Sequence, residues 1–173
     1  ISKAGLSDKD IDLILAGDLL NQCIGTSFGI REMQIPFLGL YGACSTMALS
    51  MALASVLVDS GVVNNAVAST SSHFASAERQ FRLPLEYGGQ RPPSAQRTAT
   101  ASGATVISTH QQSLPCIEAV IFGKIMDFGI KDANNMGAAM APAAADTIQN
   151  FLNDTNSEPS DYDMILTGDL GKI

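Results

Sequence analysis

The chain has 173 residues, enough for one domain with a sizeable core and too few for two ordinary domains. Apolar residues make up 46% of it, which excludes a disordered tail. The formal net charge is −7, which argues against a nucleic-acid-binding protein, because neutralising phosphates requires a surplus of Lys and Arg. The three cysteines are widely spaced and include no CxxC pair, so the sequence predicts neither a disulfide framework nor a zinc site and indicates a reducing compartment. Residues 1–12 are polar and charged, so we expect no signal peptide.

Strand and helix signals alternate along the chain. In chain order, the sequence predicts a buried strand at 10–18, a strand at 37–41, a helix at 46–58, a strand at 65–69, a Pro/Gly loop at 84–93, strands at 105–108 and 117–123, a helix at 136–152 and a strand at 164–167. Ser7 and Asp10 are spaced to cap a helical turn just ahead of the first strand. This alternation predicts a layered α/β architecture.

Residues 33–58 contain no charged residue and are long enough to suggest a membrane span. Pro36, Gly39, Gly42 and several Ser and Thr residues interrupt the apolar run, however. We therefore interpret this stretch as a buried strand followed by a buried helix.

The sequence contains an internal repeat. Residues 10–19 return as residues 161–170, with seven of ten positions identical, including a Gly-Asp pair after each apolar run. Repeats so far apart do not indicate a solenoid and favour a duplicated lobe. We expect residues 1–124 to belong to lobe one and residues 125–173 to begin lobe two. The alternative is a chance similarity between two short buried strands.

A cysteine lies at the junction of a predicted strand and a predicted helix, in Gly42-Ala43-Cys44-Ser45-Thr46. The N-terminus of a helix favours a thiolate, and small neighbours let backbone N–H groups approach a carboxylate or carbonyl. A buried, inert cysteine is the alternative interpretation.

This segment resembles the active-site segment of the thiolase and β-ketoacyl synthase superfamily, and residues 101–107 resemble its Gly-rich strand. Four further motifs, at residues 71–82, 87–93, 136–147 and 163–169, together resemble the stage V sporulation protein AD family. The resemblance runs over essentially the whole chain. It implies a thiolase-like fold, two similar lobes stacked as a five-layer αβαβα sandwich.

The same resemblance implies a function in sporulation, without a cofactor or a metal. Members of this family are associated with binding dipicolinic acid (pyridine-2,6-dicarboxylate) and with its uptake into the developing spore. Expected partners are dipicolinic acid and other stage V sporulation A proteins at the membrane, and no nucleic acid. The expected location is the cytoplasm of the developing spore, peripheral to its inner membrane, and a homodimer is possible.

Catalysis requires a base beside the thiolate. In the similar synthases, the strand equivalent to residues 164–167 is followed by a histidine, and Gly168 stands there in this chain. Of the two histidines, His110 fits a solvated loop and His73 follows a strand. We therefore expect a non-catalytic protein with Cys44 at the nucleophile-equivalent position; the alternative is a thiolase-type or ketoacyl-synthase-type acyltransferase that uses Cys44.

The expected ligand is a dicarboxylate, and an arginine guanidinium can donate a bidentate pair of hydrogen bonds to a carboxylate. Four of the chain's arginines fall within residues 79–97, and Arg82 and Arg91 flank the Pro/Gly loop. The alternative is that these arginines pair with Glu78 and Glu86 or pack a subunit interface. The expected ligand-binding residues are Cys44, Ser45, Ser71, His73, Arg82 and Arg91, with Ser72 as a further hydroxyl donor. Asp18 and Asp169 would repel an anion and are expected to do structural work or to meet a cation.

Overall fold

The computed structural model describes residues 1–77, 79, 84–87, 89, 98–109, 115–132 and 135–170. The chain divides into two compact units, Ile1–Pro115 and Cys116–Ile173. The expected lobe boundary after residue 124 stays a prediction. Half of the predicted loop at 84–93 (residues 88 and 90–93) and the polar loop that contains His110 lie outside the described residues.

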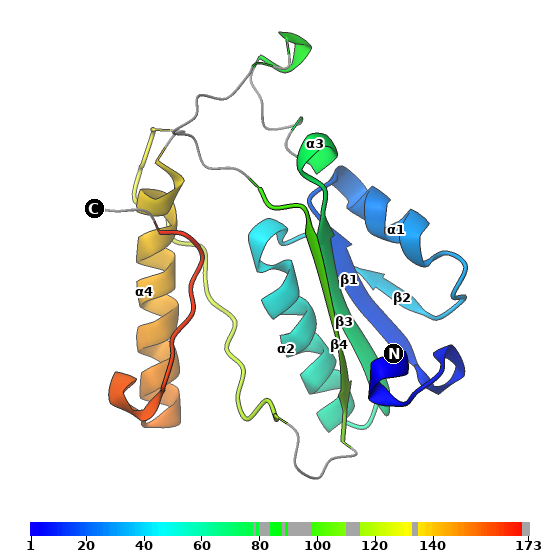
Figure 1. The fold of residues 1–173 in the computed structure, drawn as a ribbon. Helices are drawn as coiled ribbons and strands as arrows, with labels where there is room; N and C mark the ends of the chain where they lie inside the picture. The colour runs from blue at the N-terminus through cyan, green and yellow to red at the C-terminus, as the bar shows by residue number, and fades with distance from the viewer. Residues whose placement is uncertain are drawn as a thin grey trace. The chain divides into compact units, whose positions relative to one another are not determined.

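The first unit is built on a four-stranded sheet with helices on both faces (Figure 1). The strand order is β2-β1-β3-β4, and the strands are β1 (Leu13–Asp18), β2 (Phe37–Gly39), β3 (Asn65–Ser72) and β4 (Ala101–Ser108). β1 is parallel to both of its neighbours, and β4 runs antiparallel to β3. The predicted α/β class is confirmed.

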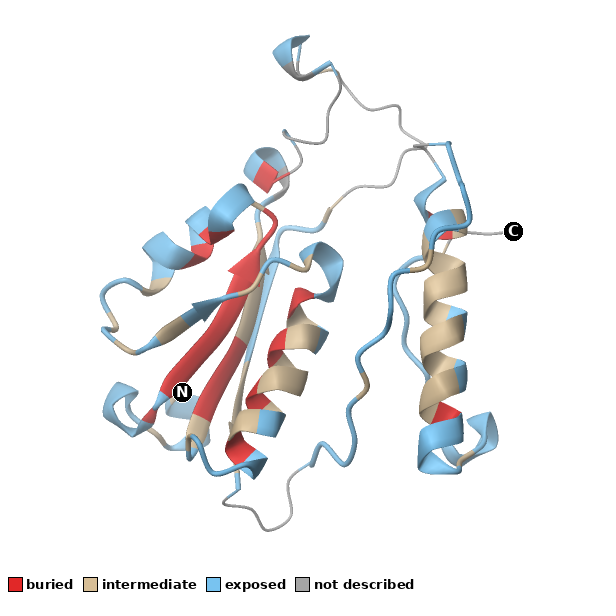
Figure 2. Ribbon diagram, turned by 180° about the vertical axis from the view of Figure 1, so that it is seen from behind, coloured by how far each residue is buried: buried red, intermediate tan, exposed pale blue. Residues whose placement is uncertain are grey.

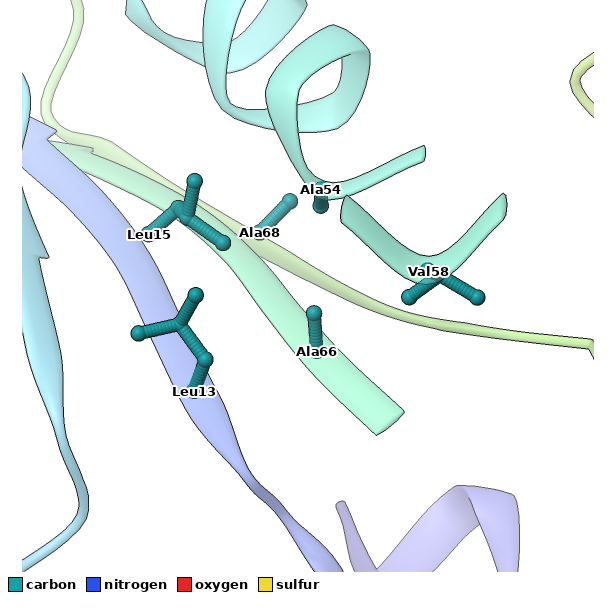
Figure 3. Close-up of a cluster of buried hydrophobic side chains, with 6 residues drawn as sticks. All are labelled: Leu13, Leu15, Ala54, Val58, Ala66 and Ala68. Carbon is teal, nitrogen blue, oxygen red and sulfur yellow. The ribbon is translucent and has the colours of Figure 1, made fainter. Parts of the chain in front are cut away.

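Side chains of β1 alternate between two apolar clusters, one on each face of the sheet. Leu13 and Leu15 pack with Ala54 and Val58 of helix α2 (Thr46–Asp59), as Figure 3 shows. On the opposite face, Ile14, Ala16 and Val67 pack with residues that include Ile30 of helix α1 (Ile24–Ile30). All six residues of β1 are buried, as is typical of a central parallel strand covered on both faces (Figure 2).

Helix α2 presents a stripe of small side chains to the sheet. Thr46, Ser50, Ala54 and Val58 recur at every fourth position and are the buried residues of the helix. Its end is a Schellman motif: Gly61 adopts φ +73°, its N–H donates to the Val58 carbonyl, and the Val62 N–H donates to the Leu57 carbonyl. The predicted helix and its stop are thus confirmed. In the described part of the chain, no helix combines the length and apolarity that crossing a membrane requires.

The second unit contains helix α4 (Met136–Thr155), which the sequence predicts up to residue 152. Its first turn is capped by Asn135, whose side-chain oxygen accepts a hydrogen bond from the Ala138 N–H. The predicted strands at 117–123 and 164–167 are wrong, since neither segment is paired. A strand needs a neighbour for its backbone N–H and C=O groups, and the described part of this unit contains none. Apolar side chains such as those of Phe122 and Leu166 are 55% and 84% exposed there.

Asp12 ties the start of β1 to the start of β3, which predicts an acid-sensitive contact. Hydrogen bonds from the backbone N–H groups of Asn65 and Asn64 lower the pKa of the Asp12 carboxyl below its usual value. The contribution to stability is therefore present above about pH 4 and is lost as the pH falls through the lowered pKa. We expect Asp12→Asn to unfold at a lower temperature than the wild type at neutral pH, with the difference shrinking in acid. Thermal unfolding at both pH values, with Asp8→Asn as an exposed control, measures this; a constant difference would contradict it.

Candidate functional site

Three adjacent strands contribute one row of polar side chains at a single edge of the sheet. β1 and β3 end there because they are parallel, and β4 begins there because it is antiparallel. In the register of the sheet, Asp18 lies opposite Ser71, and Ser71 lies opposite Ser102. Side chains opposite each other on neighbouring strands share a face. We call these three residues the polar row.

A cavity of about 370 Å³ lies against the polar row. Its other polar lining residues are Ser72, His73, Ser76 and Thr100, and Leu19, Leu20 and Ala77 contribute apolar walls. His73 is exposed and directly precedes the short helix α3 (Phe74–Ala77), whose Ala77 N–H donates to the His73 carbonyl. The carboxyl edge of parallel strands is where open α/β sheets bind ligands.

One residue that borders this cavity has a side-chain oxygen without a hydrogen-bond partner among the described residues. Within the described part of the chain, the side-chain oxygen of Ser72 is buried and makes no hydrogen bond. A buried hydroxyl without a partner costs about 1–3 kcal/mol, so such an atom in a native structure needs an explanation. An ordered water is one way to satisfy it.

Asp18 forms a buried wall of the cavity. Its carboxylate accepts hydrogen bonds from the Thr26 N–H and hydroxyl, both 2.6 Å from Oδ2, and from the Leu20 N–H, 2.7 Å from Oδ1. The side chain therefore fastens the start of α1 to the end of β1. This is the structural work that the sequence predicts for Asp18. The helix α1 itself is absent from the sequence-based prediction, because its Gly, Thr and β-branched residues are weak helix formers.

Cys44 lies in the turn that enters α2. The 3-10 turn Ala43–Ser45 precedes the helix, Ala43 has φ +48°, and the Cys44 thiol is free and exposed. Ser45 donates to the Gly42 carbonyl at 2.8 Å, and Thr46 donates to the Ala43 carbonyl at 2.9 Å. The predicted elbow at the junction of strand and helix is present, and the buried-cysteine alternative is wrong for Cys44.

The elbow and the cavity belong to different faces of the sheet. Gly17 alternates with Asp18, and a side chain built on Gly17 would meet Thr46 at the start of α2. The polar row, in contrast, lies on the face that Asp18 shares with α1. Accordingly, neither Cys44 nor Ser45 lines the cavity.

The structure brings together only part of the predicted ligand set. Ser71 and His73 line the cavity, together with Ser72, whereas Cys44 and Ser45 lie at the start of α2. Arg82 and Arg91 lie outside the described residues, so their predicted role is not tested. Sequence reasoning missed Ser76, Thr100 and Ser102, because only the strand register shows which of the chain's many serines and threonines meet.

Among the residues that the structure describes, Cys44 makes no hydrogen bond to an imidazole, and no three His, Cys, Asp or Glu side chains cluster as metal ligands would. The arrangement is that of an α/β protein with a polar cavity at the carboxyl edge of its strands and a separate exposed thiol.

Comparison with known proteins assigns the family. A family model described as Stage V sporulation protein AD (SpoVAD) matches residues 1–173. Stage V sporulation protein AD of Bacillus subtilis (strain 168) is 52% identical over 173 residues, which cover 100% of this chain and 51% of that protein. The chain belongs to the stage V sporulation protein AD family, as its motifs predict, and spans about half the length of this curated relative.

A solved structure, 3-oxoacyl-[acyl-carrier-protein] synthase III from Aquifex aeolicus VF5, also aligns with the chain. The sequences are 16% identical, the TM-score is 0.48, and the alignment covers 64% of this chain and 35% of that one.

Proposed function

We propose that the chain forms part of a non-catalytic, dipicolinate-binding protein that takes part in the uptake of dipicolinate into the developing spore. Membership of a sporulation family supports a function in the developing spore. The observation that carries the proposal is the cavity at the carboxyl edge, which collects two of the predicted ligand residues, Ser71 and His73. At about 370 Å³ it falls in the range of small-molecule sites, which is about 300–1,000 Å³.

The chemistry of the cavity suits a small aromatic dicarboxylate. Hydroxyls donate hydrogen bonds to carboxylate oxygens, and an imidazole N–H can donate to a carboxylate or a pyridine nitrogen. The apolar walls of Leu19, Leu20 and Ala77 suit the face of an aromatic ring. Arg82 and Arg91, as proposed ligand residues, would supply the positive charge that the described lining lacks.

Further parts of the proposal rest on family membership alone. They are association with other stage V sporulation A proteins, a peripheral position at the spore inner membrane, and a possible homodimer.

Acyl transfer through Cys44 is the second candidate function. The exposed thiol at the entrance to α2 favours it, because free N–H groups at a helix start stabilise a thiolate. A base is also needed for turnover, and the described residues place no imidazole on the thiol. We therefore rank binding above catalysis.

Calorimetric titration of the intact protein with dipicolinate tests the proposal. We expect saturable binding, which Arg91→Ala weakens at least about tenfold, because a charged hydrogen bond contributes about 1.5–3 kcal/mol. His110→Ala is the control and should change the affinity less than twofold. Absence of saturation in the wild type would contradict dipicolinate binding, and equal effects of the two variants would contradict the role of Arg91. Intact-mass analysis after incubation with acyl-CoA addresses the second candidate: an adduct that Cys44→Ala abolishes would favour acyl transfer.

A further inference from the structure

Two loops lie next to each other at the carboxyl edge of the sheet, because β1 and β2 are neighbouring parallel strands. Residues 19–23 lead from the end of β1 into α1, and we call them the connecting loop. Residues 40–45 lead from β2 into α2 and include the Cys44 elbow. Leu19 and Leu20 of the connecting loop also line the cavity. The connecting loop thus contacts the cavity and lies beside the segment that presents Cys44.

Two side-chain hydrogen bonds join these loops. The thiol of Cys23 is buried and donates to the Leu40 carbonyl at 3.1 Å. The Tyr41 hydroxyl donates to the side-chain oxygen of Asn21, also at 3.1 Å. Leu40 and Tyr41 directly precede the elbow, so a shift of the connecting loop acts on the residues that lead into it.

The connecting loop holds two consecutive residues in a strained backbone conformation. Gln22 has φ +61° and Cys23 has φ +53°, in the left-handed region that favours glycine. Such a conformation persists only where surrounding contacts hold it. The thiol bond from Cys23 to Leu40 is one of these contacts. In addition, the N–H of Cys23 donates to the Leu20 carbonyl, and its carbonyl accepts from the Ser27 hydroxyl. The loop can therefore exist in two arrangements, this strained one and a relaxed one that forms when a contact is lost.

The cavity acts on the first residues of the same loop. The Leu20 N–H donates to Oδ1 of Asp18 at 2.7 Å, and the Leu20 carbonyl accepts from the Cys23 N–H at 3.2 Å. Since Leu19 and Leu20 line the cavity, an occupant packs against the residues that begin the loop. An occupant that makes these contacts only in the strained arrangement favours that arrangement over the relaxed one.

We propose that the connecting loop couples the cavity to the Cys44 elbow, with Cys23 as the positioning residue. An occupant of the cavity restrains the loop, and the Cys23 thiol holds the Leu40 carbonyl, so the elbow turn becomes more rigid although Cys44 does not line the cavity. The turn then reports occupancy of the cavity on the opposite face of the sheet. The inference rests on the proposed function only for the identity of the occupant.

Hydrogen exchange of the intact protein without ligand, followed by mass spectrometry, tests the role of Cys23. We expect Cys23→Ala to speed exchange of the amides in residues 40–46 about fivefold, the effect of losing one hydrogen bond of ordinary net strength. Cys23→Ser keeps a donor for the Leu40 carbonyl and should stay within about twofold of the wild type. Residues 57–63, at the far end of α2, are the internal reference, because a general loss of stability would speed exchange at both ends of the helix.

Equal acceleration at both ends of α2 in Cys23→Ala, or none in residues 40–46, would overturn the inference. Tyr41→Phe removes the second contact between the loops at a side chain that is 50% exposed, so it leaves the core intact. It should speed exchange in residues 40–46 about twofold. If Cys23→Ala does not fold, an unchanged rate in Tyr41→Phe would overturn the inference instead.

Dipicolinate tests the coupling itself. At saturation it should slow exchange in residues 40–46 of the wild type about threefold and have no such effect in Cys23→Ala. Slowing of equal size in both proteins would show that the ligand acts on the elbow without Cys23, against the inference. Calorimetry separates the two proposals: if dipicolinate does not bind, the proposed function fails, and the ligand-free comparison of the variants still decides the role of Cys23.

Discussion

Gly17→Ala is expected to destabilise the first unit by roughly 3 kcal/mol, at the upper end of the usual cost of overpacking a core. A Cβ atom on Gly17 would lie 1.8 Å from the Leu40 carbonyl oxygen and 3.0 Å from the Thr46 methyl group. Leu40 cannot move away cheaply, because its N–H donates to the Ala16 carbonyl and its carbonyl accepts from the buried Cys23 thiol. The backbone between β2 and the Cys44 elbow would have to shift.

Gly103→Ala is the matched control for this prediction. Gly103 lies in the same sheet, in β4, and nothing lies within 4 Å of the position that its Cβ would occupy. Urea unfolding of both variants, followed by circular dichroism, measures the difference. Similar unfolding free energies for the two variants would show that the contact between Gly17 and Leu40 is looser than the structure has it.

Asp18→Ala is expected to have an effect of similar size, about 3 kcal/mol, for a different reason. The substitution leaves the Thr26 and Leu20 N–H groups without their acceptor, and each hydrogen bond to a charged group contributes about 1.5–3 kcal/mol. Asp18→Asn keeps the size of the side chain and one carbonyl oxygen, so we expect a smaller loss. The same unfolding measurement ranks the two variants.

Thr26→Val supplies the control for Asp18, because it removes one donor hydroxyl and keeps the Thr26 N–H. It should cost less than Asp18→Ala. If all three variants unfold like the wild type, Asp18 does not hold the start of α1, and the wall of the cavity depends on other contacts.

The sequence predicts the central elements of the first unit well. The apolar run that becomes β1 and the Ala-rich run that becomes α2 have strong local signals, and Gly61 marks the end of the helix. Predictions fail where an element forms only by pairing with a distant segment of the chain. Residues 164–167 repeat the first four residues of β1 in sequence but are unpaired, because a strand is defined by its neighbours.

The two copies of the sequence repeat nevertheless share one structural feature. Asp10 accepts a hydrogen bond from the Ser7 N–H at 2.7 Å, and Asp161, its counterpart, accepts one from the Glu158 N–H at 2.8 Å. The first residue of the repeat thus caps a 3-10 turn in both units, since a cap needs only contacts three residues apart. Contacts within a few residues can be predicted from the local sequence, whereas pairing between distant segments cannot.

In the candidate site, too, local features can be predicted from the sequence and features that join distant segments cannot. The Cys44 elbow is readable from a short motif, whereas the polar row joins residues from three distant segments and becomes visible only through strand register. Ser71 and His73 were within reach of sequence reasoning because they follow a predicted strand. Ser102 was not, because no local signal indicates which residue of β4 lies opposite Ser71.

The edge that carries the polar row forms only when the sheet is complete, because β4 must pair antiparallel with β3. Asp18, Ser71 and Ser102 become neighbours only after three stretches of chain have docked, so a partly folded chain possesses no such edge. A molecule that occupies the cavity therefore selects the complete native sheet over every partial one. Occupancy would protect the amide protons of β1, β3 and β4 against exchange together, as a single cooperative group.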